Sequence, residues 1–125
     1  MKKILVVDDS ETVRRQVRQA LAAGGYTIVE CVDGQQGLET ITASTDLGLV
    51  LCDVDMPRMN GLEMVTELSR LGNTVPILML TTEGDPALVQ RARAAGCKGW
   101  IVKPFKPELL VAAVTKFVPA GGGTG

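Results

Sequence analysis

The segment 49–61 constrains the fold more than any other part of the chain. It reads LVLCDVDMPRMNG, so an apolar run ends on a carboxylate, Asp53, and then on turn-forming residues. An apolar run this short, bounded by turn signals, is typical of a strand buried on both faces of a sheet. In open α/β sheets, ligands bind beyond the carboxyl ends of the strands. The segment therefore predicts a buried strand that places Asp53 at the functional edge of a sheet.

Short apolar runs alternate with helical patterns along the whole chain. Strands are predicted at residues 3–7, 26–31, 47–52, 76–80 and 98–102, and a helix is predicted after each. Residues typical of helix starts support this pattern: Asp85-Pro86 before the fourth helix, and capping boxes at Asp33-Gln36 and Asn60-Glu63. The first helical pattern begins from Ser10. The alternation predicts a doubly wound α/β fold, (βα)5, with a five-stranded parallel sheet.

The strand order follows from polarity. The runs at 26–31 and 98–102 suit the edges of the sheet better than the other three, which are more continuously apolar. This places the strands in the order 2-1-3-4-5, the order of the flavodoxin-like fold.

Composition and charge narrow the classes of function. The 125 residues suit one domain, expected at 1–118, and 119–125 are expected to be a flexible glycine-rich tail or a linker stub. With 13 basic and 14 acidic residues, the net charge of -1 disfavours direct binding of nucleic acid or a membrane surface. Neither a membrane-spanning run nor a signal-peptide pattern is found, so a cytoplasmic location is expected.

Histidine is absent, and the three cysteines are widely spaced. Without histidine, the chain lacks Ser-His and Cys-His nucleophile pairs and the commonest transition-metal ligand. Cys31, Cys52 and Cys97 lie among apolar or small residues, which indicates buried free thiols rather than disulfides or a zinc site.

Carboxylates follow two strands that the predicted order makes neighbours. Asp8 and Asp9 follow the first strand, and Asp53 follows the third, at about one interstrand spacing of ~5 Å. Like charges this close favour a raised pKa or a bound cation. Oxygen ligands with room for water suit Mg²⁺. The sequence therefore predicts a magnesium site.

Two further groups are expected at the same edge. Thr81 follows the fourth strand, and Lys103 follows the fifth, roughly 10 Å from Asp53 across the backbone, which a lysine side chain largely spans. A carboxylate, a cation, an ammonium and a hydroxyl are the groups needed to hold a phosphoryl group. Each residue alone fits a helix cap, a turn or a solvated strand end. Their joint occurrence on four strands favours phosphoryl chemistry at Asp53.

With these residues in place, the sequence resembles the receiver domains of two-component response regulators, of the CheY-like kind. The resemblance covers residues 3–118. It is carried by DD at Asp8-Asp9, by D-x-x-M-P-x-M-N-G at 53–61, by T-T-E at 81–83 and by K-P-F at 103–105.

The resemblance implies a phosphorylated signalling switch rather than a conventional enzyme. Asp53 would accept a phosphoryl group from a sensor histidine kinase, a histidine phosphotransfer protein or a small phosphodonor, and the acyl phosphate would hydrolyse slowly. Lys103 would contact the phosphoryl oxygens, and Thr81 would move toward them on activation. The bond between Lys103 and Pro104 would be cis.

The resemblance also implies a set of metal ligands and an output surface. Asp9 and Asp53 would bind Mg²⁺ directly, the carbonyl of Asp55 would complete the protein ligands, and Asp8 would act mainly through a bound water. The face formed by the fourth helix, the fifth strand and the fifth helix would dock a downstream partner, or a second copy on activation. The kinase, the target, the oligomeric state and any fused output domain stay open.

Three residues qualify this expectation. Trp100 stands where the family usually has Tyr or Phe, and we hypothesise that it reports the switch without turning fully inward. Asp55 and Glu83 lie two residues beyond Asp53 and Thr81. As acids, they are expected to modulate access of anionic phosphodonors and of hydrolytic water.

Three other interpretations fit the sequence less well. Asp53-Val54-Asp55 also resembles the DxD motif of haloacid-dehalogenase-type phosphatases, but that family carries the motif on its first strand. A flavodoxin-like protein would need a hydroxyl- and glycine-rich phosphate loop where DDSET stands. A receiver kept only as a binding module would not require the acid pair, the acceptor and the lysine, all of which are present.

Overall fold

The computed structural model describes residues 2–54, 56, 58–82 and 86–119. Within these residues, five parallel strands form one sheet in the order β2-β1-β3-β4-β5, and five helices alternate with them. The doubly wound α/β fold and the strand order predicted from the sequence are confirmed. The elements are β1 (Lys3–Val7), α1 (Glu11–Ala22), β2 (Ile28–Cys31), α2 (Gly34–Ala43), β3 (Leu47–Asp53), α3 (Gly61–Arg70), β4 (Ile77–Thr81), α4 (Pro86–Ala95), β5 (Gly99–Val102) and α5 (Pro107–Thr115).

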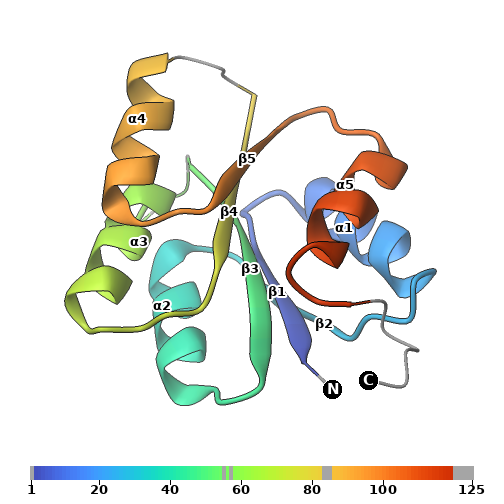
Figure 1. Cartoon of the computed structure of the whole chain (residues 1–125), viewed down its shortest axis with the longest axis horizontal. Coiled ribbons are helices and arrows are strands. Elements are labelled where there is room, and N and C mark those ends of the chain that lie inside the picture. The colour runs from blue at the N-terminus through green and yellow to red at the C-terminus, as the bar shows by residue number, and fades with distance from the viewer. Residues whose placement is uncertain (1, 55, 57, 83–85, 120–125) are drawn as a thin grey trace.

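The helices form two layers around the sheet. Figure 1 shows α2, α3 and α4 on one side of the strands and α1 and α5 on the other. Successive residues of a strand point to opposite faces, so each central strand supplies both layers. In β3, Val50 and Cys52 join the core beneath α2, α3 and α4, while Leu49 and Leu51 join the core beneath α1 and α5. This double burial explains why the central strands are continuously apolar.

The caps of α1, α2 and α3 are among the described residues, whereas Asp85, expected as the cap of the fourth helix, lies outside them and stays a prediction. The side chain of Ser10 accepts from the N–H of Val13 at the start of α1. At α3, Asn60 and Glu63 form the predicted capping box, with both bonds at 2.9 Å. At α2, the Asp33 carboxylate accepts from the N–H of Gln36, but the Gln36 side chain bonds to the N–H of Val32 instead of Asp33. The second box is therefore only half formed.

Four of the five strands differ from the prediction by one or two residues at one or both ends. Tyr26 was expected in the second strand, but its N–H bonds to Leu21 and closes α1, while its hydroxyl donates to the carbonyl of Val118 at 2.6 Å. Strands β3 and β4 each run one residue further than predicted, and they end on Asp53 and Thr81. The two site residues are therefore the last residues of paired strands, not the first residues of loops.

Other expectations concern the thiols and the ends of the chain. Cys31, Cys52 and Cys97 are buried and free, as predicted. None of the helices in the described ranges is long and apolar enough to cross a membrane. Of the predicted tail, 119–125, only Pro119 is among the described residues, so the tail stays a prediction.

Gly61 connects the first turn of α3 to the strand that carries Asp53. Its N–H bonds to the carbonyl of Val54 at 2.9 Å, and a Cβ at this position would lie 2.3 Å from the main-chain oxygen of Asp53. The contact is with backbone, so no rotamer change of a side chain relieves it. Only glycine fits between α3 and the end of β3.

We expect Gly61→Ala to lower the free energy of unfolding by about 1–3 kcal/mol, because the added methyl group overpacks a backbone contact. Urea denaturation measures this change. In an open helical position the same substitution would stabilise the protein by up to about 1 kcal/mol. A variant as stable as the wild type or more stable would contradict the close packing of α3 on Asp53.

Candidate functional site

Three carboxylates meet beyond the carboxyl ends of β1 and β3. Asp8, Asp9 and Asp53 each place an oxygen such that all three oxygens lie within 4.8 Å of one another. Asp8 is fully buried, Asp53 is 7% exposed, and Asp9 is exposed to solvent. The cluster therefore has two buried members and one open side. The predicted convergence of the three acids is confirmed as geometry.

Lys103 supplies the positive charge next to this cluster. It follows β5, and its Nζ lies 2.9 Å from Asp8 Oδ2 and 3.3 Å from Asp53 Oδ1. The side chain is 12% exposed, so both ion pairs are largely shielded from water. The sequence predicted that Lys103 reaches Asp53, and the pairing with Asp8 is an addition. One ammonium thus bridges two of the three carboxylates.

Burial and the neighbouring charges together raise the pKa values of both Asp53 and Lys103. Burial and the charge of Asp8 raise the pKa of Asp53 to about 6, although Lys103 acts in the opposite direction. For Lys103, burial by itself would lower the pKa, but the hydrogen bond and the charges of Asp8 and Asp53 outweigh it and raise the pKa. The lysine is therefore charged at neutral pH, and one lysine does not fully compensate the clustered acids.

The main chain fixes Asp53 from two sides. The residue ends β3 in register with Leu80 of β4, and the next N–H, that of Val54, bonds to the carbonyl of Leu80 at 3.3 Å. On the other side, α3 is held close through Gly61. The carboxylate therefore projects from a paired strand end.

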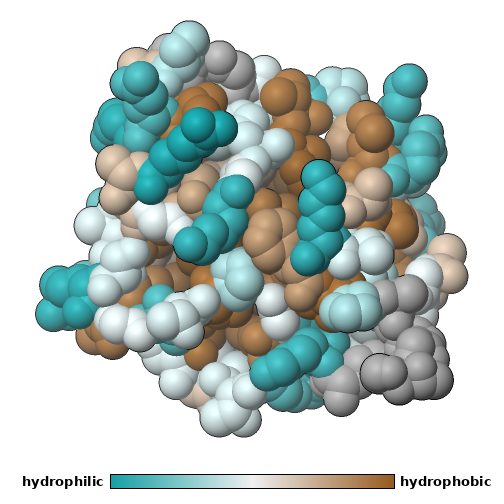
Figure 2. All heavy atoms as spheres, viewed as in Figure 1, coloured by the Kyte–Doolittle hydropathy of each residue, from teal (hydrophilic) through white to brown (hydrophobic). Residues whose placement is uncertain are grey.

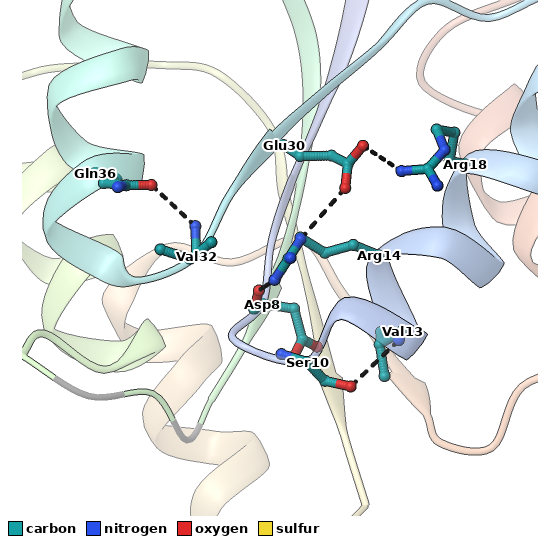
Figure 3. A network of polar contacts seen from close by, with 8 residues as sticks. All are labelled: Asp8, Ser10, Val13, Arg14, Arg18, Glu30, Val32 and Gln36. Carbon is teal, nitrogen blue, oxygen red and sulfur yellow. Dashed lines mark hydrogen bonds and ion pairs between the residues drawn. The ribbon is translucent and has the colours of Figure 1, made fainter.

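Asp8 is held by contacts that the sequence did not reveal. Its N–H bonds to the carbonyl of Cys31 on β2, and its carboxylate Oδ1 accepts from the N–H of Ser10 at 2.9 Å. Its carbonyl accepts from Arg14 Nη1 at 2.7 Å, and Arg14 also reaches Glu30 on β2 (Figure 3). The sequence does show an arginine, Arg14, in the first turns of the helix that follows the acid pair. Its hydrogen-bond partners could not be predicted without the fold.

Thr81 and Trp100 lie on the two strands beyond Asp53. Thr81 ends β4, is 2% exposed, and its carbonyl accepts from the N–H of Lys103 at 2.6 Å. Trp100 pairs with Met79 and packs against the core beneath α2, α3 and α4. By strand alternation, Thr81 lies on this same face of the sheet. The indole Nε1 of Trp100 is buried and has no hydrogen-bond partner among the described residues.

The remaining predicted residues divide into two groups. The bond between Lys103 and Pro104 is cis, as the resemblance implied. Asp55 and Glu83 lie outside the described residues, so the carbonyl ligand and both modulating acids stay predictions.

The arrangement has a definite chemical capacity. The Asp53 carboxylate is positioned as a nucleophile, the acid cluster offers oxygen ligands of the kind that Mg²⁺ prefers, and the Lys103 ammonium is positioned to pair with an incoming anion. None of these groups suits redox or acyl-transfer chemistry as well as it suits phosphoryl transfer.

Comparisons with known proteins agree with this capacity. The family model of the response regulator receiver domain matches residues 4–115. A chemotaxis protein CheY homolog of Campylobacter jejuni is 37% identical over 126 residues, which cover 98% of this chain and 97% of the relative. Chemotaxis protein CheY1 of Helicobacter pylori is 42% identical over 112 residues, covering 86% and 90% of the two chains.

A solved structure extends the likeness to three dimensions. The structure of chemotaxis protein CheY4 of Vibrio cholerae superposes with a TM-score of 0.87 at 37% sequence identity, and the match covers 94% of this chain and 99% of that chain. Both the sequence and the fold therefore place the chain in the response regulator receiver domain family of two-component signalling, among its CheY-like members.

Proposed function

We propose that the chain is a phosphorylation-dependent signalling switch whose acceptor is Asp53 and whose phosphoryl donor is a histidine kinase or a histidine phosphotransfer protein. The observation that carries this proposal is the pairing of Lys103 with Asp8 and Asp53 inside a cluster of three carboxylates. Three clustered carboxylates, with no histidine or cysteine ligand, suit a divalent cation that prefers oxygen better than a structural zinc ion. With such a cation, the site suits a phosphoryl group.

Magnesium is the cation that these residues fit. Their ligand atoms are carboxylate oxygens, and the exposed side at Asp9 leaves room for water. Asp9 and Asp53 would bind the ion directly, with the carbonyl of Asp55, and Asp8 would bind mainly through water. When bound, Mg²⁺ would neutralise charge on the phosphoryl oxygens during transfer.

The protein groups then have distinct roles in the transfer. A carboxylate oxygen of Asp53 attacks phosphorus, the bond from phosphorus to the donor imidazole breaks, and its electron pair stays on the imidazole nitrogen. Lys103 exchanges its pairing with Asp53 for a phosphoryl oxygen, and the Thr81 hydroxyl donates to another. Slow hydrolysis reverses the state, as water attacks phosphorus and releases phosphate from Asp53. Asp55 and Glu83 would modulate access of donor and water.

The output surface is the face built by α4, β5 and α5. A groove of about 400 Å³ lies on the β5 and α5 part of this face, lined mainly by apolar residues of β5, of α5 and of the segment between them, among them Trp100, Phe105 and Leu109. Figure 2 shows hydrophobic residues among hydrophilic ones near the segment that joins β5 to α5. Val102 and Leu109 are 51% and 61% exposed, which suits docking of a protein partner or of a second copy. Direct contact with nucleic acid or a membrane is not part of this function.

Three buried free thiols agree with a reducing compartment, which favours a cytoplasmic site of action. Residues 1–118 would form the switch, and 119–125 would serve as a tail or as a linker.

Phosphorylation of Asp53 is tested directly with acetyl phosphate. We expect the wild type to gain one phosphoryl group in the presence of Mg²⁺ and none in the presence of EDTA, because the transfer needs the cation to offset charge. Intact-protein mass spectrometry measures the gain. Asp53→Asn should remain unmodified, whereas Asp46→Asn, which changes an exposed acid paired with Lys3 away from the cluster, should be modified as the wild type is. Modification of Asp53→Asn to the wild-type level would refute the proposal.

Repulsion within the acid cluster predicts that the metal-free protein becomes less stable when Asp53 ionises. The pKa of Asp53 is about 6 in the folded state and about 4 in the unfolded chain, so ionising Asp53 destabilises the fold as the pH rises through this interval. In EDTA, we expect Asp53→Asn to be more stable than the wild type by about 1–3 kcal/mol at pH 8, with the difference vanishing below about pH 4.

Urea denaturation at several pH values measures this difference. Addition of Mg²⁺ should stabilise the wild type and leave Asp53→Asn nearly unchanged, since the variant lacks the third carboxylate. An Asp53→Asn protein less stable than the wild type at pH 8 would show that the Lys103 pairing outweighs the repulsion.

Trp100 is the single tryptophan of the chain, so its emission reports on β5 alone. We expect the emission to change when Mg²⁺ and beryllofluoride, a phosphoryl mimic, are added together, because Lys103 lies three residues along the same segment. Asp53→Asn is the control and should show no change. Constant emission in the wild type would count against Trp100 as part of the switch.

A further inference from the structure

Arg14 lies beside the acid cluster without pairing with it. Its Nη1 donates to the carbonyl of Asp8 at 2.7 Å, and its Nε donates to Glu30 Oε1 at 3.2 Å (Figure 3). One turn later on α1, Arg18 donates to the other oxygen of Glu30 at 2.5 Å. The Arg14 side chain is only 13% exposed. A largely buried guanidinium is thus shared between one main-chain carbonyl and one carboxylate of β2.

The carbonyl that Arg14 binds belongs to the peptide bond between Asp8 and Asp9. Its orientation sets the direction in which the two acidic side chains leave the backbone. The N–H of Asp8 is already bonded to Cys31 of β2 at 3.1 Å. Arg14 and Glu30 anchor the other side of the same residue to the same strand. The acid pair is therefore held from both sides, although it lies where β1 ends.

The two basic side chains near the cluster, those of Lys103 and Arg14, have different partners. Lys103 pairs directly with Asp8 and Asp53. Arg14 has the planar donor group that forms strong two-point contacts with carboxylates, yet its described partners are a carbonyl and Glu30. A guanidinium freed from Glu30 would find the Asp8 and Asp9 carboxylates nearby and would compete with a metal ion for them.

We propose that Arg14 and Glu30 are positioning residues of the metal site: Arg14 fixes the peptide that joins Asp8 to Asp9, and Glu30 keeps the guanidinium on that peptide and off the carboxylates. This inference rests on the Mg²⁺ site of the proposed function. It assigns the pair an effect on metal affinity and no part in the transfer itself, since neither residue reaches Asp53 or Lys103.

Magnesium titration by calorimetry tests the role of Arg14. Residues that orient metal ligands typically change metal affinity by about 10- to 100-fold when they are replaced. We expect Arg14→Met to weaken Mg²⁺ binding by about tenfold, and Arg14→Lys to restore part of the loss, because a single ammonium replaces only one of the two contacts. Arg15→Met is the matched control: it removes the same charge from an exposed position of α1 and should bind Mg²⁺ as the wild type does.

The role of Glu30 is tested by a double-mutant cycle. Glu30→Gln should also weaken Mg²⁺ binding, because it releases the guanidinium toward the acids. The double variant Arg14→Met with Glu30→Gln should bind no more weakly than Arg14→Met alone, since Glu30 acts only through Arg14. Losses that simply add would overturn the proposed coupling. Urea denaturation of every variant restricts the comparison to folded protein.

A kinetic measurement separates positioning from general damage. With acetyl phosphate as the donor, Arg14→Met should need about tenfold more Mg²⁺ for half-maximal labelling of Asp53, and its rate at saturating Mg²⁺ should equal that of the wild type. A slower saturated rate with unchanged Mg²⁺ affinity, or equal effects of Arg14→Met and Arg15→Met, would overturn the inference. A wild type that neither binds Mg²⁺ nor becomes labelled would refute the proposed function instead.

Discussion

The repulsion among three carboxylates at the end of the sheet is the constraint on which the rest of the site depends. Asp8 and Asp53 are buried side by side, and Lys103 bridges them. Burial and the charge of Asp8 still hold the pKa of Asp53 near 6. Because one ammonium leaves the cluster undercompensated, added positive charge beside these oxygens would relieve the repulsion. In the proposed function, the domain would give up some stability in exchange for a site that responds to a cation and an anion together.

The fold makes this concentration of charge possible. Parallel strands end at a common edge, so residues that are 45 and 95 positions away from Asp8 in the sequence, Asp53 and Lys103, become its neighbours. The strands beneath them are apolar on both faces and packed by helices on both sides. The hydrophobic core therefore supports the polar edge, and close contacts such as that of Gly61 with the Asp53 carbonyl leave little freedom there.

The sequence predicted the elements, their order and the acid cluster, because apolar periodicity and parallel-sheet topology determine these features almost alone. It was less accurate at Tyr26 and Gln36, where a local hydrogen bond decided the outcome: the first closes α1 instead of beginning β2, and the second caps one residue earlier than expected. Arg14 and Glu30 could not be found this way, since their contacts depend on the distance between α1 and β2. The pairing of Lys103 with Asp8 was missed for a different reason, because strand order does not determine side-chain rotamers.

The placement of Lys103 also links the chemistry to the rest of the molecule. Its N–H is bonded to the carbonyl of Thr81, and it directly follows β5, the short edge strand that carries Trp100 and lines the apolar groove. Strand alternation puts Thr81 and Trp100 on the face toward α4, whereas the ion pairs of Lys103 lie at the edge of the sheet. An edge strand is bonded on one side only, so it resists displacement less than the central strands do. In the proposed switch, a change in the partners of Lys103 would therefore act first on an edge strand that lies beside the exposed apolar surface.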